Sequence, residues 1–529
     1  MSISQRILNN TVVGLLAKFL EVAVAFLTIP ILLSSLGKEN YGFWIMCSQV
    51  LVFFGALDFG VTSSIGRFVA KYNARADKDG LINNINTSLF LLFISAILVL
   101  ISTLIVVFKY TTFFNVAPVH VNTGIYIVLI LGIGIAIDFV LRIGRGILAG
   151  IHNFDLIYIV NIIKLLYRFA LIFYIYHTVK SKSIIFISLI SISAILLSDL
   201  LMCFIARKKM ASFNLNLKNI TRSSIKEVLS LGAANLLSGI IVTFTKSLTL
   251  ILIANRLTLN DVTLYSIPVS LIVYLSMIVS TFVVSFTTLA SEAHELKKED
   301  QKIRLNIFGV RYATTACLGF GLLAVFFGRY FFPIWFQGSL SKGSLSIRDC
   351  SVISVVLNLL VIGFIFDRGQ APTAKMLLGT GSQWLSLLIS AGKNILGLLL
   401  GYTFMTFTSF GILGMAIGWL TSYSVAGIFI YPYIACWCFK INLFKYFFYV
   451  YLRPILASLP LALLSYALSQ YFKPSSWLML TTITALCAGI YCVLVYFICI
   501  EKEHRVLLVK HIKGGLFSHL KTETMSLIQ

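Results

Sequence analysis

Apolar residues occur along this chain in runs of about twenty, separated by short polar segments that carry most of the charge. A helix of this length crosses the ~30 Å hydrocarbon layer of a membrane. Fourteen such runs predict an all-α polytopic membrane protein, in which each backbone amide is satisfied within its own helix. They lie at about residues 11–33, 41–63, 85–107, 123–143, 157–177, 184–205, 228–252, 263–288, 306–328, 351–371, 384–405, 409–435, 449–470 and 477–499.

The positively charged residues lie mainly on one side of the predicted membrane. With the N-terminus inside, the inner segments hold 27 of the 42 Lys and Arg residues, the outer loops 9 and the helices 6. Such an excess is the positive-inside pattern, so both termini are expected in the cytoplasm. The net charge of +23 therefore reflects topology and does not indicate nucleic-acid binding. The first run contains Lys18 and Glu21 and has no small-residue cleavage site, which favours a spanning helix over a signal peptide.

Two parts of the chain repeat the same order of helices and loops. With a shift of 221 residues, LGKENYGFW (36–44) aligns with LTLNDVTLY (257–265), and AKYNARADKD (70–79) aligns with SEAHELKKED (291–300). Two halves of six helices enter the membrane from the same side, and a cavity is expected between them. We expect an N-terminal lobe (1–205), a basic cytoplasmic linker (206–227), a C-terminal lobe (228–435), two extra helices (436–500) and a cytoplasmic tail (501–529).

Ionisable side chains inside the runs are the candidate functional residues. Each costs about 2.5–3.5 kcal/mol on insertion scales, so we expect it to face the bundle interior, to pair or to reach the headgroups. Asp138 and Arg142 lie four residues apart and are expected to pair on one helix face, with Arg145 one turn further on. The other embedded cations are Lys18, Lys164, Arg168, Lys246, Arg311 and Lys393, and the other embedded acids are Glu21, Asp58 and Asp199.

Two interpretations of the embedded cations remain open. They line a cavity for an anionic headgroup such as pyrophosphate, whose oxygens suit ammonium and guanidinium donors, or they pair and snorkel. A position near the middle of a helix favours the cavity for Lys164, Arg168 and Lys393. Lys18 and Lys246 fit both interpretations.

The charges near helix ends fit the second interpretation better; they are Arg145, Asp199 and Arg311.

Asp58 begins the sequence DFG, which is also the magnesium-binding triad of protein kinases. The chain has no glycine-rich phosphate loop, strand lysine or H-R-D motif, so Asp58 is not expected to be catalytic. We interpret it as the end of a membrane helix, with Gly60 allowing the turn and Arg67 starting the inner loop.

No pattern in the sequence predicts a catalytic or metal site. The nine cysteines form no paired C-x-x-C motif, and the seven histidines are scattered. Every loop is short, a P-loop is absent, and neither an enzyme nor direct use of ATP is expected. Three G-x-x-x-G sequences, GILAG (146–150), GLLLG (397–401) and GMAIG (414–418), predict close helix packing.

Three stretches together carry a family resemblance. LGKENYGFW followed by LDFG and GRFVA, then RGILAGIHNFDLIYIVNIIKLLYR, and FGILGMAIGW resemble the polysaccharide flippases of the Wzx type. That family belongs to the multidrug/oligosaccharidyl-lipid/polysaccharide (MOP) exporter superfamily, together with the MATE transporters and the lipid II flippase MurJ. The resemblance covers about residues 5–435. Most such relatives have twelve helices, whereas fourteen is the number in the MurJ branch.

The resemblance implies transport by alternating access between two lobes. The cargo would be an undecaprenyl-pyrophosphate-linked oligosaccharide, an O-antigen or capsule repeat unit, crossing the bacterial inner membrane. A proton or sodium gradient or the membrane potential would reset the cycle, with Glu21 or Asp138 as candidate coupling carboxylates. It implies partner proteins too, a polysaccharide polymerase and a chain-length regulator. The family's basic cavity would be lined here by Lys18, Glu21, Lys164, Arg168, Lys246 and Lys393. Alternatives are a cation-coupled drug exporter, a lipid II flippase and a membrane glycosyltransferase or polymerase.

Overall fold

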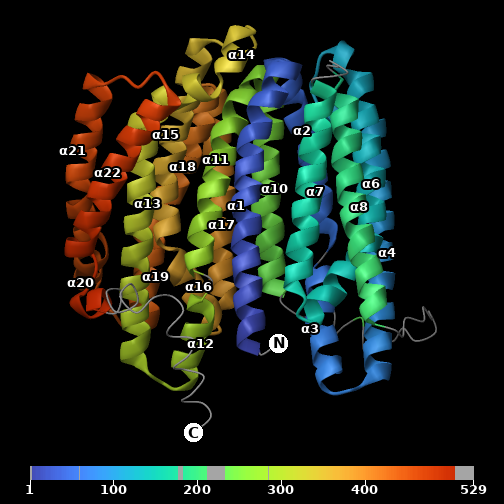
Figure 1. The fold of residues 1–529 in the computed structure, drawn as a ribbon, viewed down its shortest axis with the longest axis horizontal. Coiled ribbons are helices and arrows are strands. Elements are labelled where there is room, and N and C mark those ends of the chain that lie inside the picture. The colour runs from blue at the N-terminus through green and yellow to red at the C-terminus, as the bar shows by residue number, and fades with distance from the viewer. Residues whose placement is uncertain are drawn as a thin grey trace. The chain divides into compact units, whose positions relative to one another are not determined.

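The computed structural model describes residues 3–58, 60–176, 183–210, 225, 233–283 and 285–506. Within these residues all regular secondary structure is helical (Figure 1). Fourteen helical segments are long and apolar enough to span a membrane, and each predicted run falls on one of them. The predicted all-α polytopic fold is therefore confirmed.

The helices of the first half carry six spans. Their bounds are α1 (Ile3–Leu36), α2 (Lys38–Gly55), α3 (Val61–Ala74), α4 (Lys78–Phe108), α5 (Tyr110–Phe113), α6 (Pro118–Gly150), α7 (Phe154–Tyr174) and α8 (Ile184–Lys209). Most of the predicted basic linker, 206–227, lies outside the described residues, as does the tail beyond residue 506.

The helices of the second half and the C-terminal pair carry the other eight spans. Their bounds are α10 (Ala233–Arg256), α11 (Leu259–Val283), α12 (Phe286–Glu295), α13 (Glu299–Trp335), α14 (Gln337–Ser341), α15 (Ile347–Gly369), α16 (Ala371–Gly379), α17 (Gln383–Phe407), α18 (Ile412–Val425), α19 (Tyr431–Phe439), α20 (Leu443–Phe447), α21 (Arg453–Tyr471) and α22 (Trp477–Ile498).

The second span ends earlier than the apolar run predicts. Helix α2 stops at Gly55 and is followed by one 3₁₀ turn, Ala56–Asp58. Gly60 then takes a left-handed conformation (φ 73°), which glycine adopts without strain, and α3 begins. Arg67 lies inside α3, so its expected place at the start of an inner loop is wrong.

The same turn occurs at matching positions of the two sequence repeats. Ala76 (φ 53°) and Lys297 (φ 52°) are both left-handed and are separated by the 221-residue shift seen in the sequence. In both turns the N–H of the following residue donates to the carbonyl five residues earlier, at 3.1 and 2.9 Å. This Schellman-type arrangement ends a short helix, and the next helices start at the matching residues Lys78 and Glu299.

By its internal contacts the chain forms two compact units. Unit 1 comprises Met1–Ser270, Trp335–Val356 and Ser390–Gly418, and unit 2 comprises Leu271–Ile334, Leu357–Ile389 and Trp419–Gln529. Unit 1 thus holds the first six spans together with parts of the second repeat. The division into lobes at 1–205 and 228–435 stays a prediction from sequence.

Unit 1 is built around α6, which packs against α8, α4, α3 and α2. Glycines on α6 make these approaches possible. A Cβ on Gly144 would lie 2.5 Å from the backbone nitrogen of Cys203 on α8, and one on Gly146 would lie 2.6 Å from the Ile65 side chain on α3. The predicted role of GILAG in close helix packing is therefore confirmed.

In unit 2, α21 and α22 pack against each other, and their apolar residues share a core with Phe327 of α13. Arg311 of α13 is only 1% exposed; it donates to the Tyr449 carbonyl at 2.6 Å and to Glu501 at 2.7 Å. Glu501 also pairs with Arg453 at 2.6 Å. The apolar run places Arg311 near the start of its helix. This is wrong, because α13 begins at Glu299 and Arg311 lies inside it.

The ionisation of Glu501 follows from these contacts. Burial disfavours its charged form, but the hydrogen bond from Arg311 and the positive charge of Arg453 outweigh burial and hold the pKa of Glu501 below its usual range. Glu501 therefore stays ionised and ties the end of the described chain to α13 and α21.

Candidate functional site

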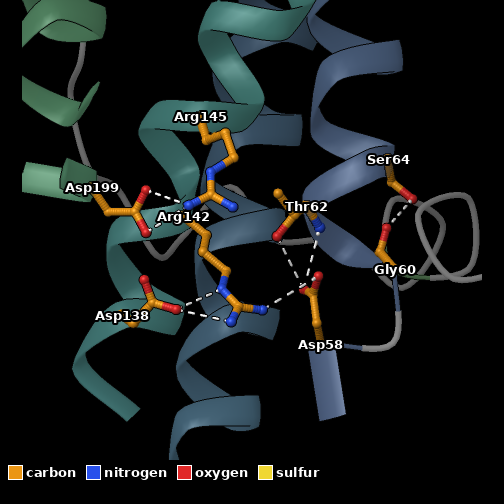
Figure 2. Close-up of polar contacts among 8 residues, drawn as sticks. All are labelled: Asp58, Gly60, Thr62, Ser64, Asp138, Arg142, Arg145 and Asp199. Carbon is orange, nitrogen blue, oxygen red and sulfur yellow. Dashed lines mark hydrogen bonds and ion pairs between the residues drawn. The ribbon is translucent and has the colours of Figure 1, made fainter. Parts of the chain in front are cut away.

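Five charged residues meet in the interior of unit 1, and Figure 2 shows their arrangement around α6. Arg142 donates from Nε to Asp138 Oδ2 at 2.8 Å, and its Nη1 lies 3.8 Å from Asp58 Oδ2. Arg145, one turn further on, donates from Nη2 to both oxygens of Asp199 on α8, at 2.7 and 2.9 Å. The pairing of Asp138 with Arg142 predicted from their spacing is present. We call these five residues the α6 charge cluster.

Asp58 joins the α6 charge cluster to the start of α3. Its Oδ1 accepts hydrogen bonds from the backbone N–H of Thr62 at 3.3 Å and from the Thr62 hydroxyl at 3.1 Å. A carboxylate at a helix N-terminus accepts a hydrogen bond from a backbone N–H that has no partner in the helix, and its negative charge interacts favourably with the positive end of the helix dipole. These contacts support a structural role for Asp58, which stays a prediction, and the turn at Gly60 brings the carboxylate into position (Figure 2).

Lys18 and Glu21 form an ion pair of 2.8 Å along α1, with side chains 51% and 40% exposed. Their shared helix face was predicted from the spacing. Lys164 on α7 differs, since its ammonium donates to Asn161 Oδ1 at 3.0 Å and forms no ion pair with a carboxylate of the described residues. The guanidinium of Arg145 is within electrostatic range of Lys164, and so are the carboxylates of Asp199, Glu21 and Asp138.

The other three predicted cavity cations lie on separate helices of unit 1. Arg168 on α7 and Lys246 on α10 are exposed, and Lys393 on α17 is half-buried. Each takes part in an interaction in the structure, so none of them is without a partner. Their place in a cargo site stays a prediction.

Residues from the two sequence repeats also meet within unit 1, where α2 packs against α10 and α11. The Thr263 hydroxyl donates to the Lys38 carbonyl at 2.7 Å. Gly42 sits so close to α11 that an added Cβ would lie 1.9 Å from the Leu259 carbonyl oxygen. Lys38 and Gly42 correspond to Leu259 and Thr263 under the 221-residue shift, so matching segments of the two repeats touch each other.

Two further polar contacts hold the same ends of the helices together. The Asn255 side chain donates to the Phe113 carbonyl at 2.8 Å and accepts from the Asn115 backbone N–H at 3.1 Å. Lys38 pairs with Asp349 at 2.9 Å. Together with the Gly42 contact, these interactions form what we call the repeat clasp.

A groove lies in unit 2 between α13 and the C-terminal pair α21 and α22. Its volume is about 690 Å³. Almost all of its lining is apolar, with side chains such as Phe320, Leu461 and Tyr491, and Tyr312 and His504 lie at its edge. The Tyr312 hydroxyl and His504 Nδ1 are 2.6 Å apart. A groove of this composition suits a hydrocarbon chain.

Several of these features were not visible in the sequence. Arg145 and Asp199 are 54 residues apart, and Lys38 and Asp349 are 311 apart, so no local spacing connects them. Asn161, the hydrogen-bond acceptor of Lys164, is three residues before it on the same helix face, a signal that was available.

Comparison with known sequences identifies one family. The family model described as polysaccharide biosynthesis protein matches residues 7–288, which is more than half of the 529 residues. No match was found among curated protein sequences.

Solved structures share the fold. An inward-facing multidrug resistance MATE transporter of the MOP superfamily has a TM-score of 0.67 at 18% identity, covering 81% of this chain and 95% of its own. The lipid II flippase MurJ in an inward closed conformation has a TM-score of 0.68 at 11% identity, covering 92% and 98%. A MOP transporter from Pyrococcus furiosus, described as having a binding pocket of reverse polarity, has a TM-score of 0.59 at 17% identity, covering 81% and 95%.

Proposed function

The chain belongs to the polysaccharide biosynthesis protein family, and from that premise we propose that it is a lipid-linked oligosaccharide flippase. The cargo we propose is an undecaprenyl-pyrophosphate-linked O-antigen or capsule repeat unit, carried from the cytoplasmic to the outer leaflet of a bacterial inner membrane. Both termini then lie in the cytoplasm, in accord with the excess of Lys and Arg in the inner segments. The chain acts as a transporter and not as an enzyme.

The observation that carries this proposal is the pair of cations Lys164 and Arg145. Lys164 lies in an apolar span with an amide oxygen as its hydrogen-bond acceptor, and a second cation lies nearby. Arg145 is paired with Asp199 on one side, yet its side chain is 35% exposed. Asp199 already pairs with Arg145 and acts on Lys164 at longer range, together with Glu21 and Asp138, but no carboxylate of the described residues contacts the Lys164 ammonium. A pyrophosphate would supply that contact, with acceptor oxygens for both donors.

The apolar groove in unit 2 supports the lipid part of the cargo. A prenyl chain needs a path that keeps it out of water, and the groove beside α21 and α22 supplies apolar contacts along α13. These two helices are the pair outside the sequence repeats. We assign the prenyl chain to this groove, which gives α21 and α22 a role in transport.

The repeat clasp supports alternating access. With both termini in the cytoplasm, the loops that contain Lys38, Asn115, Asn255 and Asp349 face the outer side. Their contacts hold matching segments of the two repeats together, as an outer gate does in its closed state. Release of cargo to the outer leaflet requires these contacts to open.

A lipid II flippase is the second candidate. The observation in its favour is coverage, since the match to MurJ covers 92% of the chain and the match to the MATE transporter covers 81%. A drug exporter is less favoured, because cationic drugs need acids or aromatic rings in the cavity and the embedded cations of this chain outnumber the embedded acids. A glycosyltransferase or polymerase is disfavoured by the short loops.

The test is a flipping assay with the full chain in liposomes. Fluorescent undecaprenyl-pyrophosphate oligosaccharides and lipid II are supplied on one side, and their appearance on the other side is followed by quenching. We expect the oligosaccharide lipids to move, Lys164→Gln to slow them at least tenfold, and Lys109→Gln, an exposed lysine outside the site, to behave as wild type. Movement of lipid II alone supports the second candidate, and movement of neither lipid contradicts the proposal.

A further inference from the structure

The charges of the α6 charge cluster do not balance. Three carboxylates, Asp58, Asp138 and Asp199, face two guanidiniums, Arg142 and Arg145 (Figure 2). These five residues by themselves carry one net negative charge, and Lys164 offsets it only at longer range, without contacting a carboxylate. An unbalanced charge away from water is expensive, and such a cluster gains stability from one more positive charge.

The geometry shows where that charge belongs. Arg142 contacts Asp138 through Oδ2, from both Nε and Nη2 at 2.8 Å. The other oxygen, Oδ1, is buried and accepts no hydrogen bond from the residues that the structure describes. In Figure 2 it points toward the carboxylate of Asp199, and the two carboxyl groups lie within hydrogen-bonding reach. The side chains of Asp138 and Asp199 are 4% and 0% exposed, so water does not screen them.

We propose that Asp138 and Asp199 bind one proton between them. Two carboxylates in direct contact repel each other strongly in a low-dielectric interior, whereas a shared proton turns the contact into a short hydrogen bond. The proton also balances the charge of the α6 charge cluster. The use of this proton in a transport cycle rests on the proposed function, but its presence does not.

The surroundings of the pair contain few other titratable groups. Arg142 and Arg145 come from α6 itself, Asp58 from the 3₁₀ turn, and Lys164 from α7 at longer range. On α8, the Cys203 thiol donates to the Leu141 carbonyl at 3.0 Å and is therefore protonated. Glu21 on α1 is paired with Lys18. None of these described groups supplies the missing proton donor to Asp138 Oδ1.

The arrangement links the proton to an anion. Arg145 is the described guanidinium bonded to Asp199, and because its side chain is 35% exposed, a phosphate oxygen can approach it. When an anion draws Arg145 away, Asp199 loses its counter-charge and the protonated form of the pair becomes favoured. By linkage the reverse also holds, so protonation of the pair strengthens binding of the anion.

Infrared difference spectroscopy of the full chain in lipid nanodiscs tests the shared proton without any cargo. We expect a carbonyl band of a protonated carboxylic acid in neutral solution, which shifts with ¹³C-labelled aspartate and disappears in Asp138→Asn. The control Asp79→Asn, an exposed carboxylate at the start of α4, should keep the band. Should Asp138→Asn fail to accumulate, Asp199→Asn removes the other half of the pair. Absence of the band in wild type, or its survival in a folded variant, overturns the proposal.

A second measurement adds inorganic pyrophosphate and follows proton uptake with a pH indicator. Uptake of close to one proton per bound pyrophosphate in wild type, and none in Asp138→Asn, supports the linkage; binding without uptake contradicts it. Failure of pyrophosphate to bind counts against the proposed function and leaves the infrared result to decide on the proton. If the infrared band is absent but the lipid-linked oligosaccharide is still flipped, the shared proton is contradicted and the proposed function stands.

Discussion

Replacement of Gly42 by alanine places a methyl group at the closest contact of the repeat clasp. The added Cβ would lie 1.9 Å from the Leu259 carbonyl oxygen and 2.8 Å from Thr263 Oγ1. Real Cβ atoms essentially never approach other atoms within 3.0 Å, so α2 and the start of α11 must separate by roughly 1.1 Å, the difference between 3.0 and 1.9 Å. Because the Leu259 oxygen belongs to the backbone, no side-chain rotation relieves the clash.

The cost of this methyl group falls on the closed clasp alone. Overpacking of a tight contact costs about 1–3 kcal/mol. When the segments are apart, Gly42 has no close neighbour, so the same energy acts on the equilibrium between closed and open clasp. The expected shift toward the open clasp is roughly 5- to 150-fold.

Double electron–electron resonance measures this shift directly. Spin labels at Thr112→Cys and Asn260→Cys, in a background without other reactive cysteines, report the separation of the two repeats at the clasp. Gly42→Ala should move the distance distribution to longer values, and Gly55→Ala on the same helix, where a Cβ meets no atom within 4 Å, should not. An unchanged distribution in Gly42→Ala would refute the assignment of this contact as part of a closed gate.

Three further predictions concern stability. Arg311→Met removes a buried donor of Glu501 and is expected to cost about 2–3 kcal/mol of unfolding free energy, measured by thermal denaturation in detergent; an unchanged midpoint contradicts the role of Arg311. Since the pKa of Glu501 is lowered, its contribution to stability is complete above its ordinary value of 4.5 and is lost as the pH falls through the lowered pKa. Glu501→Gln should remove that acid-side loss from a pH series of melting temperatures, and an identical series would argue against it. Gly418→Ala brings a Cβ to 2.1 Å from the Gly401 nitrogen and should lower the melting temperature, whereas Gly392→Ala, with open space, should leave it unchanged; equal effects of the two would contradict the close packing.

Much of the fold could be predicted from the sequence because membrane helices are specified locally. A run of about twenty apolar residues must satisfy its own backbone, so length and composition alone give the fourteen spans found in the described part of the chain. The loop AKYNARADKD and its counterpart could be aligned because both end in the same left-handed turn. The early end of α2 was missed, since the apolar run continues past the turn at Gly60 and hydropathy does not register backbone conformation.

The candidate site was predicted only in part. Asp138 and Arg142 are neighbours on one helix face, which spacing reveals. The pairing of Arg145 with Asp199 joins two helices far apart in sequence, and no local pattern contains it. The exact use of Gly42 was likewise hidden, although LGKENYGFW was recognised as a family motif, because the backbone that excludes a side chain there is 217 residues away.

The most direct test of the account compares the binding of two lipids to the full chain in nanodiscs. Undecaprenyl pyrophosphate and uncharged undecaprenol share the prenyl chain and differ in the headgroup. If Lys164 and Arg145 hold the anionic headgroup, wild type should bind the pyrophosphate lipid at least about tenfold more tightly, a difference of about 1.4 kcal/mol, and Lys164→Gln should lose most of that preference. Equal affinity of wild type for both lipids, or a preference that Lys164→Gln leaves intact, would contradict the claim that these cations serve the cargo.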